Sequence, residues 1–223
     1  MKFIIFNGSP AEANSNTNVI GEAFFSGAKK AGADTENVFL INRKIGHCKG
    51  CFTCWFQTPG KCVMQDDMPE LLDKYDSADV VCFATPVYTW NMTAAMKNFV
   101  DRLAPLKSPL IVNCNENFDL ADSKPKTQQF MVISNCGFPG NNNFETMEAV
   151  FPSCNPVLEI YRNCGKLLKS KDQEIKKTVN EYLKAVELAG FEMATQNYVS
   201  KETKAKLEMQ LMSTPDYVKY IGM

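Results

Sequence analysis

The stretch Asp79-Val80-Val81-Cys82-Phe83-Ala84-Thr85 is an almost unbroken apolar run of strand length. A strand that is buried on both faces has this composition, and such strands belong to parallel sheets that are covered by helices on each side. Residues 128–134 repeat the pattern, and residues 2–6, 35–41 and 157–161 are further strand candidates. The sequence therefore predicts five strands around a central, fully buried one.

Helical periodicity occurs in the intervals between these strands. The expected helices cover residues 16–32, 67–75, 93–103, 144–151, 173–190 and 200–211. Five strands that alternate with helices predict a three-layer α/β sandwich, and a flavodoxin-like strand order 2-1-3-4-5 is the natural one. We expect one domain over residues 1–223, with a cysteine-rich insertion at 42–65 after the second strand and a C-terminal helical extension at 164–223.

Charge and composition exclude several classes of protein. Of the 223 residues, 24 are lysine or arginine and 25 are aspartate or glutamate, so the net charge is -1. A protein that grips nucleic acid usually has a basic excess, so no nucleic-acid partner is expected. The apolar opening run Phe3–Phe6 is too short for a signal peptide or a membrane span, so we expect no membrane association and a cytoplasmic location.

In a sheet of this kind the ligand lies at the carboxyl ends of the strands, which directs attention to three loops. The first loop, residues 7–17, is rich in hydroxyl and amide side chains and contains no lysine or arginine. It lacks the lysine of a nucleotide triphosphate loop and the three glycines of a dinucleotide fingerprint. Neutral donors at a helix start suit a single terminal phosphate. The alternative is that these residues only form a turn and cap the helix.

The second loop, residues 86–92, contains Tyr88 and Trp90, which could cover a planar ring. They could equally pack against the neighbouring helix or against a second subunit. The third loop, residues 135–143, contains glycines that can bring backbone amides close to a ring edge, although a flexible surface turn is also possible.

These motifs together resemble a known family. Asn7-Gly8-Ser9-Pro10, residues 14–17, Pro86-Val87-Tyr88-Thr89-Trp90 and residues 97–102 resemble the NADPH-dependent FMN reductase branch of the flavodoxin-like superfamily. The cysteine segment, with residues 60–63 and 66–68, resembles the iron–sulfur flavoproteins of that branch. The resemblance covers about residues 1–140 and weakens beyond 150.

The resemblance implies non-covalent FMN in a homodimer or homotetramer, reduced by NAD(P)H or by an electron-carrier protein. The residues that it implies for the phosphate are Ser9, Ser15, Asn16 and Thr17, and Pro10 is expected to be a further cofactor contact in the same loop. Those that it implies for the flavin ring are Pro86, Val87, Tyr88, Thr89, Trp90 and Asn91, with Cys136 and Gly137 near its other edge.

Four of the nine cysteines, Cys48, Cys51, Cys54 and Cys62, lie within fifteen residues. Overlapping two-residue gaps let thiolates converge on one centre without regular secondary structure, as a 4Fe–4S cluster requires. Zinc usually takes two separated pairs and fits this spacing less well. A third possibility is that no metal binds and the thiols are free or form a disulfide. The other five, Cys82, Cys114, Cys136, Cys154 and Cys164, are expected to be small buried side chains.

The resulting hypothesis is an FMN-dependent oxidoreductase that passes electrons from NAD(P)H to a flavin, quinone, nitroaromatic or protein acceptor. The flavin would perform the hydride chemistry, so no catalytic side chain is expected. Two alternatives remain at this point. One is an iron–sulfur flavoprotein that acts mainly in electron transfer, and the other is a flavodoxin-like binding module without catalysis.

Overall fold

A computed structural model describes residues 1–114, 117–123, 128–151 and 155–222. Its centre is a parallel sheet of five strands in the order β2-β1-β3-β6-β7. The strands are β1 (Lys2–Asn7), β2 (Asp34–Phe39), β3 (Val80–Pro86), β6 (Gln129–Asn135) and β7 (Leu158–Arg162). Every residue of β3 is buried, as its apolar composition predicted. The observed order confirms the expected flavodoxin-like topology.

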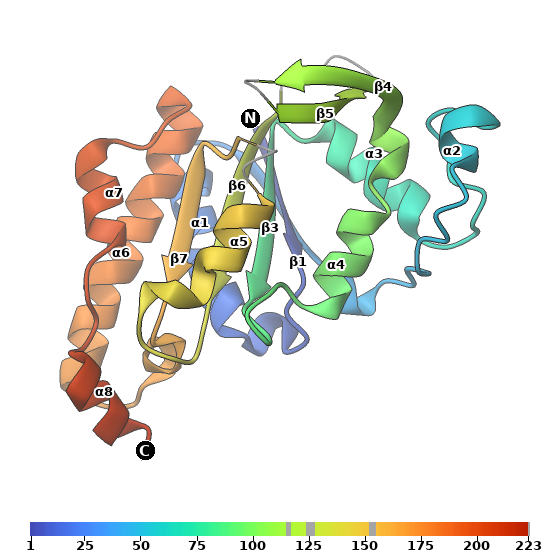
Figure 1. Cartoon of the computed structure of the whole chain (residues 1–223). Coiled ribbons are helices and arrows are strands. Elements are labelled where there is room, and N and C mark those ends of the chain that lie inside the picture. Colours follow the sequence, from blue (N-terminus) through green and yellow to red (C-terminus); the bar gives the residue numbers. More distant parts are fainter. Residues whose placement is uncertain (115–116, 124–127, 152–154, 223) are drawn as a thin grey trace.

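Helices cover both faces of this sheet (Figure 1). One face packs against α1 (Asn16–Lys30) and α6 (Gln173–Gln196), with residues from both helices in a common core. The other face packs against α3 (Met68–Ser77), α4 (Ala94–Asp101) and α5 (Glu145–Val150). Because every parallel strand needs cover on two sides, this arrangement gives the three-layer sandwich.

Two glycines allow α1 and α6 to approach closely. A Cβ atom on Gly27 would lie 1.7 Å from the backbone oxygen of Glu187, and one on Gly190 would lie 2.0 Å from that of Phe24. No side chain of any size fits at either position, so the pair of glycines sets the distance between the two helices. Helix α6 is therefore an integral layer of the sandwich, and it extends six residues beyond the predicted end at 190.

Two short helices follow α6. Helix α7 (Lys201–Leu207) begins where predicted but ends four residues before the predicted end at 211, and Ser200 caps it by accepting from the Thr203 N–H. Helix α8 (Thr214–Tyr220) was not predicted, although its Tyr217 is fully buried in the core. Among the described residues, no helix combines the length and the apolar character that crossing a bilayer requires.

An antiparallel hairpin of β4 (Lys107–Cys114) and β5 (Asn117–Asp122) was also not predicted. It lies at the end of the sheet where the chain begins, away from the carboxyl ends of the parallel strands (Figure 1). The cysteine insertion contains the single-turn helix α2 (Thr53–Phe56) and is otherwise irregular.

Several single turns of 3-10 helix complete the chain. They are η1 (Glu12–Asn14), η2 (Leu40–Asn42), η3 (Ala104–Leu106), η4 (Asn141–Phe144) and η6 (Gly165–Lys169).

Three of the dispersed cysteines, Cys82, Cys136 and Cys164, are buried as expected. Cys154 lies outside the described residues, and the side chain of Cys114 is also not described.

Candidate functional site

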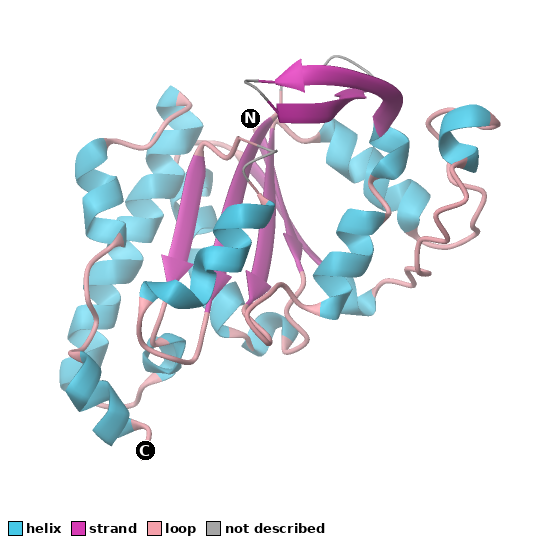
Figure 2. Cartoon of the chain, viewed as in Figure 1, coloured by secondary structure: helices cyan, strands magenta, loops and turns pink. Residues whose placement is uncertain are grey.

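The three loops selected from the sequence meet at the carboxyl ends of β1, β3 and β6, which lie at the lower edge of the sheet in Figure 2. Hydrogen bonds join all three of them. The Gly8 N–H donates to the Ala84 carbonyl at 2.8 Å, and the Val87 N–H donates to the Asn135 carbonyl at 2.8 Å. The buried Asn135 amide also donates to the Thr17 hydroxyl at 2.7 Å. The three loops, residues 7–17, 86–92 and 135–143, are thus one connected unit, which we call the rim. It lies at the carboxyl ends of the strands, where ligands bind in sheets of this kind.

Gly8 lies where the first loop touches α4. A Cβ atom there would be 2.7 Å from the Cβ of Met96, so only glycine fits. The Thr93 hydroxyl donates to the Gly8 carbonyl at 2.6 Å and also caps α4 by accepting from the Met96 N–H. One threonine therefore fixes both the helix start and the first loop.

The first loop presents a set of hydrogen-bond donors at the start of α1. Within the described part of the chain, neither the Asn16 and Thr17 N–H groups nor the Ser9 hydroxyl has a hydrogen-bond acceptor. The Thr17 hydroxyl accepts from Asn135, so its own hydrogen remains available. These donors stand at the positive end of a fifteen-residue helix, and such an arrangement binds anions.

Two predicted cofactor residues of this loop, Ser15 and Pro10, have other surroundings. The Ser15 hydroxyl accepts from the Asn18 N–H at 2.9 Å and donates to the Glu12 carbonyl at 2.7 Å, so it caps α1. Pro10 is exposed. The capping interpretation therefore accounts for Ser15, while the other donors of the loop are left without partners.

A lysine that the sequence did not suggest lies beside this loop. The Lys169 ammonium group, from η6, donates to the carbonyl of Asn14. The expectation that only neutral groups surround the first loop therefore needs correction: a cation reaches it from a segment 155 residues further along the chain.

The second loop contains a tight turn. Tyr88 and Asn91 form two backbone hydrogen bonds with each other, and the residues between them, Thr89 and Trp90, both have positive φ angles of 50° and 59°. A β-branched residue rarely adopts this conformation, and such strain is concentrated at functional sites. The turn leaves Tyr88 and Trp90 53% and 62% exposed.

The residues before that turn are anchored. Pro86 is the buried last residue of β3, and Val87 packs against the core beneath α3 and α4. The aromatic tip of the loop is thus exposed while its base is fixed.

In the third loop, Cys136 and Gly137 have different surroundings. Cys136 is buried, its thiol donates to the Phe138 carbonyl at 3.2 Å, and both of its backbone groups are hydrogen-bonded. Burial raises the pKa of Cys136 to about 11, so the thiol stays neutral. Gly137 has open space where a side chain would stand, and its carbonyl accepts from the Tyr217 hydroxyl at 2.5 Å. Gly137 is therefore the residue of this pair that can meet a ligand.

The cysteine segment forms a second site on the far side of α4. Cys48, Cys51, Cys54 and Cys62 all line one small cavity of about 50 Å³. Burial and the negative charge of the other three thiols raise the pKa of Cys54. A hydrogen bond from the Thr53 side chain lowers the pKa of Cys51. Among the described residues, no three His, Cys, Asp or Glu side chains converge on one point as ligands of a single ion do.

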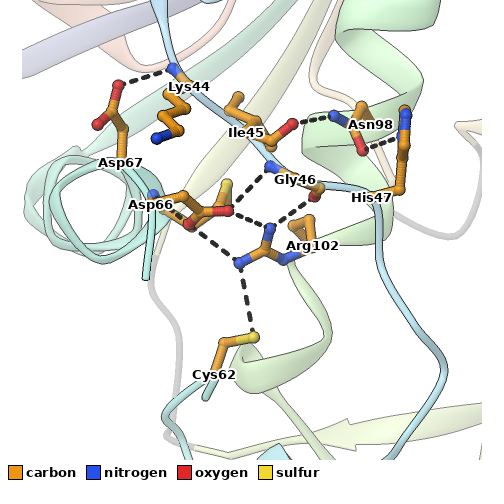
Figure 3. Close-up of polar contacts among 10 residues, drawn as sticks. Lys44, Ile45, Gly46, His47, Cys62, Asp66, Asp67, Asn98 and Arg102 are labelled. Atoms are coloured by element: carbon orange, nitrogen blue, oxygen red, sulfur yellow. Dashed lines mark hydrogen bonds and ion pairs between the residues drawn. The ribbon is translucent and has the colours of Figure 1, made fainter. Parts of the chain in front are cut away.

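A buried ion pair lies beneath this cavity (Figure 3). The Arg102 guanidinium makes two contacts with the Asp66 carboxylate, at 2.6 and 3.1 Å, and the two side chains are only 2% and 4% exposed. Arg102 also donates to the Gly46 carbonyl at 2.6 Å and lies 3.5 Å from the Cys62 sulfur. Burial raises the pKa of Asp66, but hydrogen bonds from Arg102, Gly46 and Met68 outweigh it and hold that pKa below its ordinary value.

Helix α4 connects the two sites. Its first residues follow Thr93 at the rim, and its last turn presents Asn98 and Arg102 to residues 45–47. Asn98 donates to the Ile45 carbonyl at 2.6 Å and also contacts the His47 ring (Figure 3). Arg102 was not predicted to bind a ligand. Its spacing was a usable signal, because Met96, Phe99 and Arg102 recur every three residues on the buried face of the helix.

Fold and rim together define a flavodoxin-like protein with a set of free hydrogen-bond donors, among the described residues, at the carboxyl edge of its sheet. Residues 1–117 match the family of NADPH-dependent FMN reductases. The chain therefore belongs to this family, as its motifs predicted.

The relatives and the solved structures agree with this assignment. An iron–sulfur flavoprotein of Archaeoglobus fulgidus is 37% identical over 105 residues, which are 47% of this chain and 46% of the relative. An NAD(P)H:quinone oxidoreductase from Methanothermobacter marburgensis has a TM-score of 0.63 at 16% identity, over 86% of this chain and 96% of that one. An FMN-dependent NADH-azoreductase from Bacillus anthracis, in complex with FMN, has a TM-score of 0.60 at 14% identity, over 87% and 99%. The matched stretch spans about half the length of the curated relative, and the two structures establish the fold alone.

Proposed function

We propose that the chain is an FMN-dependent NAD(P)H oxidoreductase whose flavin phosphate binds at the start of α1. The observation that carries this proposal is a set of donor hydrogens at the rim that have no acceptor among the described residues: the N–H groups of Asn16 and Thr17 and the hydroxyl hydrogens of Ser9 and Thr17. An anion satisfies such donors, whereas an empty turn leaves them to water. Membership of the FMN reductase family and the FMN-bound azoreductase structure support the choice of FMN.

The chain's own residues would bind and orient this cofactor. Thr17 donates its hydroxyl hydrogen to the phosphate because Asn135 occupies its lone pair. The strained turn at Thr89 and Trp90 offers two exposed aromatic rings for stacking, and Gly137 offers an open backbone edge. When bound, FMN supplies hydride chemistry with NAD(P)H, and the chain contributes placement.

We propose further that Cys48, Cys51, Cys54 and Cys62 hold a 4Fe–4S cluster. In a cluster of this type each cysteine binds a different iron, so the four sulfurs surround a volume and do not meet at one point. Four cysteines line one cavity, and their closely spaced order in the sequence suits this requirement better than the two separated pairs that zinc usually takes. The Archaeoglobus relative, named an iron–sulfur flavoprotein, supports the same proposal.

A cluster at the opposite end of α4 from the flavin site favours a protein or a one-electron acceptor over a purely small-molecule role. The exposed Tyr88 and Trp90 would then lie near a subunit contact, which supports a homo-oligomer. The seven cysteines whose side chains are described are free thiols.

Anaerobic titration of the purified protein tests this proposal. Stepwise addition of NADPH should bleach a flavin band near about 450 nm, with about four irons per chain in the same sample. Reduced ferredoxin, added separately, tests the alternative that a protein supplies the electrons. A flavin band that neither reductant bleaches would contradict the redox function, and bleaching without iron would contradict the cluster alone.

A further inference from the structure

We infer that Arg102 is a positioning residue: it places a buried positive charge against Cys62 and thereby raises the reduction potential of the proposed cluster. The inference rests on the cluster proposed above. It assigns a role to a side chain that is not itself a ligand and that lies outside the cysteine motif.

The geometry shows a guanidinium that is held firmly. Its Nη1 donates to the Gly46 carbonyl and to one Asp66 oxygen, and its Nη2 donates to the other Asp66 oxygen. The same Nη2 lies 3.5 Å from the Cys62 sulfur. Since the planar fork is fixed by Asp66 and by a backbone carbonyl, its direction toward the sulfur does not depend on the sulfur itself.

Burial makes this charge effective. The Arg102 side chain is 2% exposed, so water screens its field far less than that of an exposed cation. Lys49, beside Cys48 in the same cavity, is the contrast, because it is exposed and solvated. Lys49 and Arg102 therefore both line the cysteine cavity, but only Arg102 is buried and paired with a buried carboxylate, that of Asp66.

The sign of the effect follows from charge. Reduction of a cluster adds one electron and hence one negative charge, which a neighbouring cation stabilises. A hydrogen bond to a ligand sulfur acts in the same direction. Arg102 therefore makes the cluster easier to reduce, and Asp66 partly offsets this effect because it brings a negative charge to the same place.

Loss of the charge on Arg102 and loss of the charge on Asp66 should therefore shift the midpoint potential of the cluster in opposite directions. Redox titration of the anaerobically purified holoprotein, followed by electron paramagnetic resonance, gives the midpoint potential of the cluster. We expect a more negative potential for Arg102→Gln than for the wild type, and a less negative one for Asp66→Asn. Arg102→Lys keeps the charge and should fall between Arg102→Gln and the wild type. Lys49→Gln, the exposed control, should shift the potential less than Arg102→Gln.

A merely structural role would not produce this pattern, because loosening the loop from either side would shift both potentials in the same direction or release iron from both variants. If Arg102→Gln loses its iron, the midpoint potential of Asp66→Asn still tests the inference. An unchanged or more negative potential in Asp66→Asn overturns it. A wild-type protein that binds FMN but no iron overturns the cluster and the inference together. A wild-type cluster whose potential is unaffected in Arg102→Gln overturns the inference alone.

Discussion

Thr17 and Asn135 are 118 residues apart in the sequence, yet the Asn135 amide nitrogen lies 2.7 Å from the Thr17 hydroxyl oxygen. Both side chains are buried, at the first turn of α1 and at the end of β6. The bond joins the loop that follows the first strand to the loop that follows the fourth parallel strand. Because the Thr17 oxygen accepts in this bond, its own hydrogen is not used between the two side chains and can be donated to an anion.

Removal of that hydroxyl should weaken FMN binding. A hydrogen bond to a charged group contributes about 1.5–3 kcal/mol, so Thr17→Val should raise the FMN dissociation constant about tenfold or more. Quenching of flavin fluorescence measures it on the apoprotein. Riboflavin, which has no phosphate, should bind both proteins equally, and Thr195→Val, an exposed threonine on α6, should change neither affinity. An equal loss for riboflavin would contradict a contact with the phosphate.

Lys169 should favour FMN over riboflavin through its charge. Lys169→Met should weaken FMN binding by a few-fold at low salt, and the difference should shrink as salt is raised, because the ammonium group is exposed. Parallel titrations with FMN and riboflavin at two ionic strengths check this. Lys184→Met, an exposed lysine on α6, is the matched control. A loss that does not depend on salt would show that Lys169 acts through its contact with Asn14 and not through its charge.

Gly27 should tolerate no side chain. A methyl group there would lie 1.7 Å from the Glu187 carbonyl, so Gly27→Ala must force α1 and α6 apart. Overpacking of this kind costs about 3 kcal/mol of unfolding free energy. Urea denaturation should show the loss, while Glu181→Ala, at an exposed position of α6, should change stability by less than about 0.5 kcal/mol. Equal stability of the two variants would contradict the close helix contact.

Asp66 should contribute stability that is lost in acid. Its pKa is held below the ordinary value of 3.8 by Arg102 and two backbone N–H groups, so the stabilisation is present above that pH. It disappears as the pH falls through the lowered pKa of the folded state. Asp66→Asn should be less stable by about 3 kcal/mol near neutral pH, because it leaves the Arg102 charge buried without its partner. The difference from the wild type should narrow below about pH 4.

Denaturation of the iron-free proteins between about pH 3 and 7 measures this difference without a contribution from the cluster. All other carboxylates titrate in both proteins and cancel. A gap that stays constant across the range would show that Asp66 does not carry the acid sensitivity.

Much of the fold follows from local sequence, because buried parallel strands are apolar along their whole length. Residues 80–86 and 129–135 show this pattern, and the structure places them at the centre of the sheet. The β4–β5 hairpin escaped prediction because its strands carry no such run, and Pro109 interrupts the first of them. Helix α8 escaped because it has only seven residues and depends on Tyr217 for its burial.

The same distinction between local sequence and tertiary structure applies to the candidate site. The three rim loops and the cysteine quartet could be found because their residues are close together in the sequence. The contact of Lys169 and the pairing of Arg102 with Asp66 could not, because only the tertiary structure brings these side chains to their partners; the spacing of Arg102 indicated its burial alone. Asp67 gives a local example: it precedes α3, but its carboxylate accepts from the Lys44 N–H at 2.7 Å and does not cap the helix.

A crystal structure of the chain with FMN tests the central claim most directly. We expect the phosphate on the N–H groups of Asn16 and Thr17, with the flavin ring between the Tyr88–Asn91 turn and Gly137. Density for FMN elsewhere, or a rim filled by the protein's own side chains at saturating FMN, would contradict the claim.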